Sequence, residues 1–351
     1  MPWDWLPGRP RWVPRWLGNV MTALVALAAL AALAGIGYEQ LALARADRHA
    51  PPAAEMIDVG GYRLHLRCAG AGSPIVVMDA ALGESMRTWD KVWPAIAKET
   101  RVCMVDRAGL GWSDAGPMPR DSARMATELG TLLERAQLQG PYILVGHSLG
   151  GLNVRIFAGR HPAAVAGIVL VDSGHPDQVR RMPPKSAAEF ADTRRKLRWF
   201  SRTAPFGLPR LLGIWPCDAA PHCHLYLETG LAEMASVERD LAEAADVRSL
   251  GDTPLLVLSQ DPHLQTGWMS EEEKATWNQL QLDLLRLFPQ RSRHRRAKSP
   301  LHPAGAPGSG DRRRLSAGGG GSRLIAAALN RDLTHYRGST TTRSLRPPWA
   351  E

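Results

Sequence analysis

The serine of Gly146-His147-Ser148-Leu149-Gly150 is the residue best placed to act as a nucleophile. The apolar run Tyr142–Val145 before it predicts a buried strand, and the amphipathic pattern Leu149–Gly159 after it predicts a helix. A strand that turns directly into a helix holds such a serine on a strained turn with its hydroxyl exposed. Glycines suit the flanking positions because the turn brings backbone segments too close together for side chains. We therefore identify Ser148 as the candidate nucleophile.

The elements that must position this serine alternate between strand and helix, which predicts an α/β fold with a mainly parallel sheet and helices on both faces. The predicted strands are Met56–Val59, Tyr62–Arg67, Ile75–Asp79, Val102–Val105, Tyr142–Val145, Ala166–Val171 and Leu255–Leu258. The predicted helices are Asp90–Lys98, Ser122–Leu138 with Asp121 as its N-cap, and Leu149–Gly159. The alternation breaks over residues 174–252, which predicts a helical lid over the carboxyl ends of the strands, where ligands bind.

The N-terminal region predicts a transmembrane helix. Residues 20–38 carry no charge and are mostly Ala, Leu and Val, which is about the length that crosses a bilayer core. The arginines and tryptophans of residues 1–19 indicate that this segment stays in the cytoplasm, so the body of the protein is exported. Residues 39–55 then form a linker. A signal peptide cleaved near Ala42-Leu43-Ala44 is the alternative to an uncleaved anchor.

The basic charge of the chain belongs to its last segment. The formal net charge is +9, whereas residues 289–351 hold 13 Lys and Arg against 3 Asp and Glu, a net of +10. The body, including the domain predicted at residues 56–288, is therefore near neutral, and no nucleic-acid partner is expected for it. The Gly/Pro-rich composition of the tail predicts disorder. Binding of nucleic acid or anionic lipid by the tail remains an alternative hypothesis.

The four cysteines lack the spacing of metal ligands, and no metal or organic cofactor is expected. Cys68 and Cys103 fall in predicted strands and are interpreted as small buried apolar residues. Cys217 and Cys223 would form a disulfide if their loop is exported, and would remain free thiols otherwise.

Several blocks of residues 56–288 resemble the α/β-hydrolase superfamily, in particular its large bacterial group of serine hydrolases. They are the serine pentapeptide, Val76–Glu84 followed by Trp89, Val105–Asp114 and Val169–Asp177. The resemblance implies a small-molecule carboxylic ester as substrate, cleaved through an acyl-enzyme intermediate. A serine nucleophile rather than an aspartate argues against dehalogenases and epoxide hydrolases. The apolar residues of the predicted lid favour lipid-like or aryl esters.

The resemblance also implies an oxyanion hole, formed by the backbone N–H groups of Leu149 and Leu82. Ala81 stands where relatives often carry glycine, so a positive φ at Ala81 would strain this loop. Asp106 and Arg107 are interpreted as structural residues that fix the loop Gly109–Gly111. The triad acid is Asp261, after the last predicted strand, or Asp172, after the strand before it.

The triad histidine is the part of the family pattern that this chain lacks. Relatives carry it in an apolar segment, but here the chain turns basic after Pro289, and His302 lies nearest to the expected place, with His294 and His335 as the others. Codons for Pro300–Ala304 read one base later permit His-Tyr-Ile-Gln-Leu, which resembles the missing segment. We interpret the tail as the product of a frameshift. The alternative function is a pseudoenzyme that keeps the fold without turnover.

Overall fold

The computed structural model describes residues 15–48, 55–214, 217, 222–260, 269–287 and 292–296. The chain forms two compact units, one of residues 1–50 and 199–224 and the other of residues 51–198 and 225–351.

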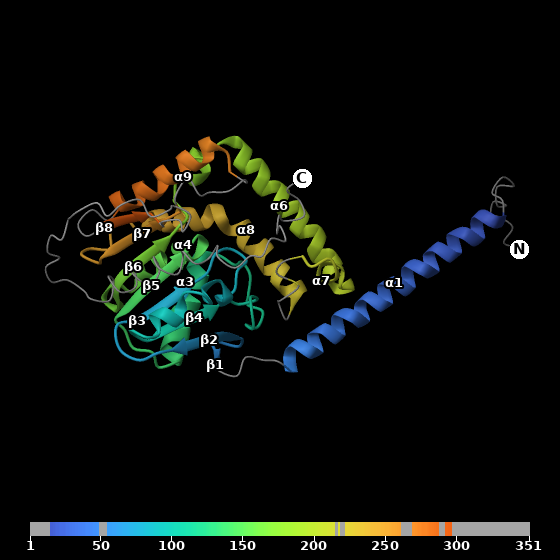
Figure 1. Cartoon of the computed structure of the whole chain (residues 1–351), viewed down its shortest axis with the longest axis horizontal. Helices are drawn as coiled ribbons and strands as arrows, with labels where there is room; N and C mark the ends of the chain where they lie inside the picture. Colours follow the sequence, from blue (N-terminus) through green and yellow to red (C-terminus); the bar gives the residue numbers. More distant parts are fainter. Residues whose placement is uncertain are drawn as a thin grey trace, which may run out of the picture. The chain divides into compact units, whose positions relative to one another are not determined.

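The larger unit is built on a sheet of eight described strands in the order β1-β2-β4-β3-β5-β6-β7-β8 (Figure 1). They are β1 (Glu55–Asp58), β2 (Arg63–Ala69), β3 (Ile75–Asp79), β4 (Val102–Asp106), β5 (Tyr142–His147), β6 (Val165–Val171), β7 (Leu255–Ser259) and β8 (Ser292–Arg296). β1, β2 and β4 pair antiparallel, and the remaining pairs are parallel. The predicted mainly parallel sheet is confirmed. Residues 292–296, in the segment whose composition predicts disorder, form β8 instead.

Helices connect these strands along the chain. They are η1 (Met86–Trp89), α2 (Trp93–Ile96), α3 (Ser122–Arg135), α4 (Leu149–Arg160), η2 (Pro162–Ala164), α5 (Gln178–Arg181), α6 (Pro184–Thr203), η3 (Ala204–Phe206), α7 (Leu208–Leu211), α8 (Cys223–Asp246), α9 (Glu271–Leu284) and η5 (Leu285–Leu287). Among them, η3 and α7 belong to the smaller unit. The side chain of Asp121 accepts a hydrogen bond from Arg124 N and caps α3, as predicted. The helix predicted over Asp90–Lys98 shrinks to the single turn of α2, because Pro94 suits only a first helical turn.

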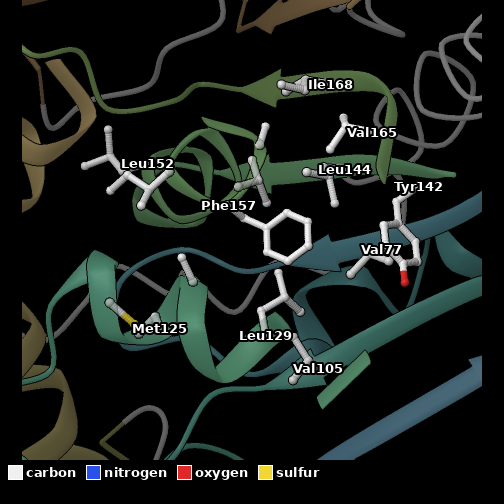
Figure 2. Close-up of a cluster of buried hydrophobic side chains, with 14 of the residues drawn as sticks. Val77, Val105, Met125, Leu129, Tyr142, Leu144, Leu152, Phe157, Val165 and Ile168 are labelled. Carbon is white, nitrogen blue, oxygen red and sulfur yellow. The ribbon is translucent and has the colours of Figure 1, made fainter. Parts of the chain in front are cut away.

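Apolar side chains pack on both faces of the sheet. Val77 of β3 and Phe157 of α4 belong to the cluster shown in Figure 2, where α3 and α4 lie against one face. Val76, the neighbour of Val77 on the same strand, belongs to the cluster on the opposite face, with Trp89 of η1 and Ile96 of α2. Adjacent side chains of a strand point to opposite faces, so a strand between two layers of helices must be apolar throughout.

The interpretation of Cys68 and Cys103 as unbridged apolar residues is wrong. They lie opposite one another on the antiparallel strands β2 and β4, with their Cα atoms 4.1 Å apart, and form a disulfide. A second disulfide joins Cys217 to Cys223, which is one of the two alternatives that the sequence left open.

The smaller unit contains α1 (Arg15–Arg48), which includes the predicted apolar segment. Residues Trp16–Arg45 are long and apolar enough to cross a membrane, and the most apolar stretch of 18 residues within them has a mean hydropathy of 2.3. Helix α1 continues to Arg48, through most of the segment predicted as a linker.

Asp240 belongs to α8, and its buried carboxyl group lies beside Ser122, the first residue of α3. Its Oδ1 accepts a hydrogen bond of 2.7 Å from Ser122 N, while its Oδ2 is buried without a partner among the described residues. Burial raises the pKa of Asp240 from 3.8 to about 7, because the hydrogen bond from Ser122 does not offset the loss of hydration and the charges of Glu243 and Asp121. The folded state therefore favours the protonated acid.

We expect Asp240→Asn to stabilise the protein at about pH 8 by roughly 1–3 kcal/mol and to have little effect at about pH 4. The folded pKa lies above the unfolded value, so the native chain loses stability as the pH rises between the two, and an amide does not titrate. Denaturant unfolding at both pH values measures the difference. Glu238→Gln, on the exposed side of α8, is the control. An equal effect of Asp240→Asn at both pH values would contradict this explanation.

Candidate active site

Ser148 lies on the predicted strained turn between β5 and α4. Its φ and ψ are 51° and −112°, a left-handed conformation that non-glycine residues adopt rarely. Ser148 N donates a hydrogen bond of 3.0 Å to Val171 O at the end of β6. A Cβ atom on Gly146 would collide with the backbone of Gly150, and one on Gly150 would collide with the carbonyl groups that follow β3. The two glycines therefore allow the turn to close.

The loop after β3 contains Leu82, the predicted second oxyanion donor, and buried Arg107 holds this loop. Arg107 Nη1 donates to Ala80 O at 2.8 Å, and Nη2 donates to Ala81 O at 2.7 Å. Ala81 is not among the described residues with positive φ, so the strain considered for it does not arise; Gly83 adopts φ 63° instead. The carbonyl groups on the N-terminal side of Leu82 are thus fixed by one side chain.

Arg107 is itself held by two carboxylates. It lies 2.6 Å from Asp79 Oδ1, and its Nε donates to Glu233 Oε1 of α8 at 2.8 Å. Burial opposes the charge of Arg107, but Glu233 and Asp79 outweigh burial and raise its pKa above the usual value. Glu233 Oε2 also accepts a hydrogen bond of 2.7 Å from Gly83 N. Arg107 is structural, as expected, but its side chain holds the loop after β3 rather than the loop Gly109–Gly111.

Asp106, in contrast, holds the loop Gly109–Gly111, as expected. Its Oδ2 accepts a hydrogen bond from Trp112 N at 3.2 Å and lies 2.6 Å from Nδ1 of buried His65, and its Oδ1 accepts from Met86 N. No local sequence pattern predicts the His65–Asp106 pair. β2 is three strand positions from β5 in the sheet, which at about 4.8 Å per strand separates His65 from Ser148 by roughly 14 Å. His65 is therefore too far away to act directly as the base for Ser148.

His147, the residue before Ser148, faces Glu84 and Trp89. Its Nδ1 lies 3.7 Å from Glu84 Oε2, and its ring packs edge-on against Trp89. Burial alone would raise the pKa of Glu84, but hydrogen bonding to His147, together with Thr88, lowers it overall. These contacts direct the His147 ring toward the loop after β3.

Of the two candidate acids, Asp172 is described and Asp261 lies outside the described residues. Asp172 follows β6 with φ 39°, and its carboxylate accepts hydrogen bonds of 3.2 Å from Gln260 N and from Trp277 Nε1 of α9. Both donors come from the side of β7 and α9, away from β5. Asp172 therefore joins β6 to these two elements.

The candidate histidines are not brought to the nucleophile by the described structure. His302 and His335 lie outside the described residues, and for His294 only the backbone is described, in β8 in register with Val257. His175, which the sequence reasoning passed over, is close to the turn: Gly174 N, just before it, donates to Ser148 O at 3.1 Å. His175 is buried, and burial lowers its pKa.

Residues 74–293 match the model of a protein family described as having the alpha/beta hydrolase fold. An uncharacterised protein of Schizosaccharomyces pombe is 43% identical over 83 residues, which cover 24% of this chain and 16% of that protein. An uncharacterised vacuolar membrane protein of Saccharomyces cerevisiae is 30% identical over 147 residues, or 35% of this chain and 23% of that protein. The chain thus spans less than half the length of these relatives.

Solved structures share the fold. The haloalkane dehalogenase DatA of Agrobacterium tumefaciens is 20% identical with a TM-score of 0.52, covering 70% of this chain and 87% of that one. A variant of DBJA is 16% identical with a TM-score of 0.51, covering 70% of this chain and 89% of that one. At this identity the likeness shows the fold alone. The match to the family over residues 74–293, together with the eight-stranded sheet, shows that this chain belongs to the α/β-hydrolase family.

Proposed function

We propose that this protein is a serine hydrolase that cleaves carboxylic esters through an acyl-enzyme intermediate. The observation that carries this proposal is the strained conformation of Ser148 at the start of α4, beside the Arg107-bound loop after β3. The cost of such a backbone conformation, about 1–3 kcal/mol, persists where surrounding structure enforces it. Family membership supports a hydrolase, and the serine supports ester cleavage in preference to the chemistry of the dehalogenase neighbours.

In the proposed reaction, Ser148 Oγ attacks the ester carbonyl carbon while a histidine accepts the hydroxyl proton. The carbonyl oxygen becomes an oxyanion, which the N–H groups of Leu149 and Leu82 stabilise. The tetrahedral intermediate collapses, and the alcohol leaves with the proton from the histidine. Water, deprotonated by the same histidine, then attacks the acyl-enzyme, and release of the acid restores the serine.

We further propose that α1 anchors the protein in a membrane and that the hydrolase domain lies outside the cytoplasm. Two observations support this topology. The positively charged residues of the N-terminal segment precede α1, as expected of a cytoplasmic end. The chain also contains two disulfides, which persist in oxidising compartments. The substrate is then a small ester outside the cytoplasm.

The histidine base is the missing part of this proposal, and the frameshift interpretation supplies it. β8 ends at Arg296, before the codons for Pro300–Ala304, which permit the family's histidine segment when read one base later. A test protein with a single base deleted between codons 296 and 300 reads that frame, keeps the whole described sheet and differs only in the residues that follow. Among the proposed catalytic groups, the chain as written and the restored chain differ only in the histidine that acts as general base.

We expect the restored-frame protein to hydrolyse p-nitrophenyl esters and to react with a fluorophosphonate probe at Ser148. The chain as written should be slower by a factor of about a thousand or more, because its serine lacks a base. Ser148→Ala in the restored chain is the control that shows which residue reacts. If both chains remain unlabelled although folded, the pseudoenzyme is the better description.

We propose Asp261 as the triad acid, because it follows β7 (Leu255–Ser259) by two residues, at the carboxyl end of the sheet. In the restored chain, Asp261→Asn should lower kcat by about 10⁴-fold, because an amide stabilises the wrong histidine tautomer. Asp172→Asn should mainly lower thermal stability. Steady-state kinetics and thermal unfolding of both variants separate these effects. The reverse pattern of kcat losses would assign the acid to Asp172.

Glu233 is proposed as a positioning residue for the oxyanion loop. Glu233→Gln weakens the hold on Arg107 and Gly83 N, so we expect kcat of the restored chain to fall by about tenfold with little change in KM. An oxyanion donor acts on the transition state more than on bound substrate, which is why the two constants should separate. Glu238→Gln, exposed on the same helix, should change neither. A purely structural role for Glu233 would instead lower thermal stability without this change in kcat.

A further inference from the structure

The apolar helix α1 and residues 199–214 are joined by a buried ion pair. Arg210 Nε and Nη2 each lie 2.9 Å from a carboxylate oxygen of Glu39, and Glu39 is only 4% exposed. Arg210 Nη1 also donates to Cys217 O at 2.7 Å, in the loop that the Cys217–Cys223 disulfide closes. Two parallel hydrogen bonds between a guanidinium and a carboxylate fix both distance and orientation. The segment is therefore held at a defined level along α1.

That level lies at the end of the apolar part of α1. Glu39 is the first charged residue after the uncharged run of residues 20–38. Gly35, one helical turn or about 6 Å earlier, contacts the backbone of Phe206, and a side chain at Gly35 would collide with Phe206 O. Gly207 approaches the ring of Tyr38 in the same way. The polypeptide around η3 thus packs beside the last turn of the uncharged run of α1.

The same segment exposes large apolar side chains. Trp199 is 51% exposed, Phe206 45%, Leu211 71% and Leu212 56%. Exposed Arg202 lies among them in the sequence, and α6, which leads into the segment, carries Arg194, Arg195 and Arg198. Aromatic and aliphatic side chains interleaved with arginines suit the boundary between acyl chains and anionic head groups. In water, such a group of apolar side chains would be costly to leave exposed.

We propose that residues 199–214 lie in the surface of the membrane that α1 spans, on the side where α1 ends. Phe206, Leu211 and Leu212 insert near the head groups, and Arg202 binds lipid phosphates. This inference rests on the proposed membrane anchoring by α1 and not on the proposed ester hydrolysis. Membrane contact then consists of a spanning helix and an adjoining interfacial segment, which Glu39 and Arg210 connect.

The test uses the full chain reconstituted in vesicles of phosphatidylcholine and phosphatidylglycerol. The fluorophore NBD is attached to a single introduced cysteine, and lipids with a doxyl quencher at a shallow or a deep acyl position report its depth. Leu211→Cys samples the segment, and Leu24→Cys samples the uncharged run of α1. Met118→Cys, 58% exposed in the other unit, is the matched apolar control. We expect the label at 211 to be quenched by the shallow doxyl, the label at 24 by the deep one, and the label at 118 by neither.

Quenching at 24 without quenching at 211 would overturn the interfacial segment while leaving the anchor intact. Absence of quenching at 24 would overturn the anchor and this inference with it. Charge reversal tests the link: Glu39→Arg and Arg210→Glu should each abolish shallow quenching at 211, and the double variant should restore it. Single variants that keep quenching at 211 would show that the ion pair does not hold the segment. None of these measurements depends on ester hydrolysis, so a failed esterase assay leaves the result interpretable.

Discussion

The buried guanidinium of Arg107 connects more of the candidate site than any other described side chain. It follows β4, binds Asp79 at the end of β3, binds Glu233 of α8, and fixes the carbonyl groups of Ala80 and Ala81. Removing one partner from such a buried charge pair typically costs about 3–5 kcal/mol, because the remaining charge has lost its hydration. The ends of two strands, one helix and the loop that contains Leu82 therefore depend on the same charge.

The turn at Ser148 depends on this cluster through shared neighbours. Asn153 of α4 donates to Asp79 Oδ2 at 2.8 Å, so the carboxylate that binds Arg107 also binds the helix that begins after Ser148. Gly150 touches the backbone of Asp79 and Ala80. A strained serine requires rigid surroundings, since a backbone conformation of this kind relaxes wherever its neighbours allow it. Strand β3, helix α4 and Arg107 together supply that rigidity.

The sheet could be predicted from the sequence because strands buried on both faces must be apolar throughout, and Val102–Val105 or Tyr142–Val145 contain little else. The turn at Ser148 could be predicted because Gly146 and Gly150 stand where the close approach of backbone segments excludes side chains. The role of Glu233 and the Cys68–Cys103 disulfide could not be predicted. Each joins segments that are distant in the sequence, and neither forms a recognisable local pattern. β8 could not be predicted, because its arginines leave it without the apolar pattern of a buried strand. It forms a strand through its pairing with β7.

The charges around Arg107 also indicate how an oxyanion would be stabilised. One guanidinium faces two carboxylates, Asp79 and Glu233, so the cluster presents no excess positive charge to a developing anion. In the proposed reaction, stabilisation would come from dipoles that are already oriented: the N–H of Leu149 at the positive end of α4 and the N–H groups of the loop after β3. Because the ion pairs hold these dipoles in place, little reorganisation is needed as negative charge develops. Arg107 would then contribute to catalysis through the loop it fixes rather than through its own charge.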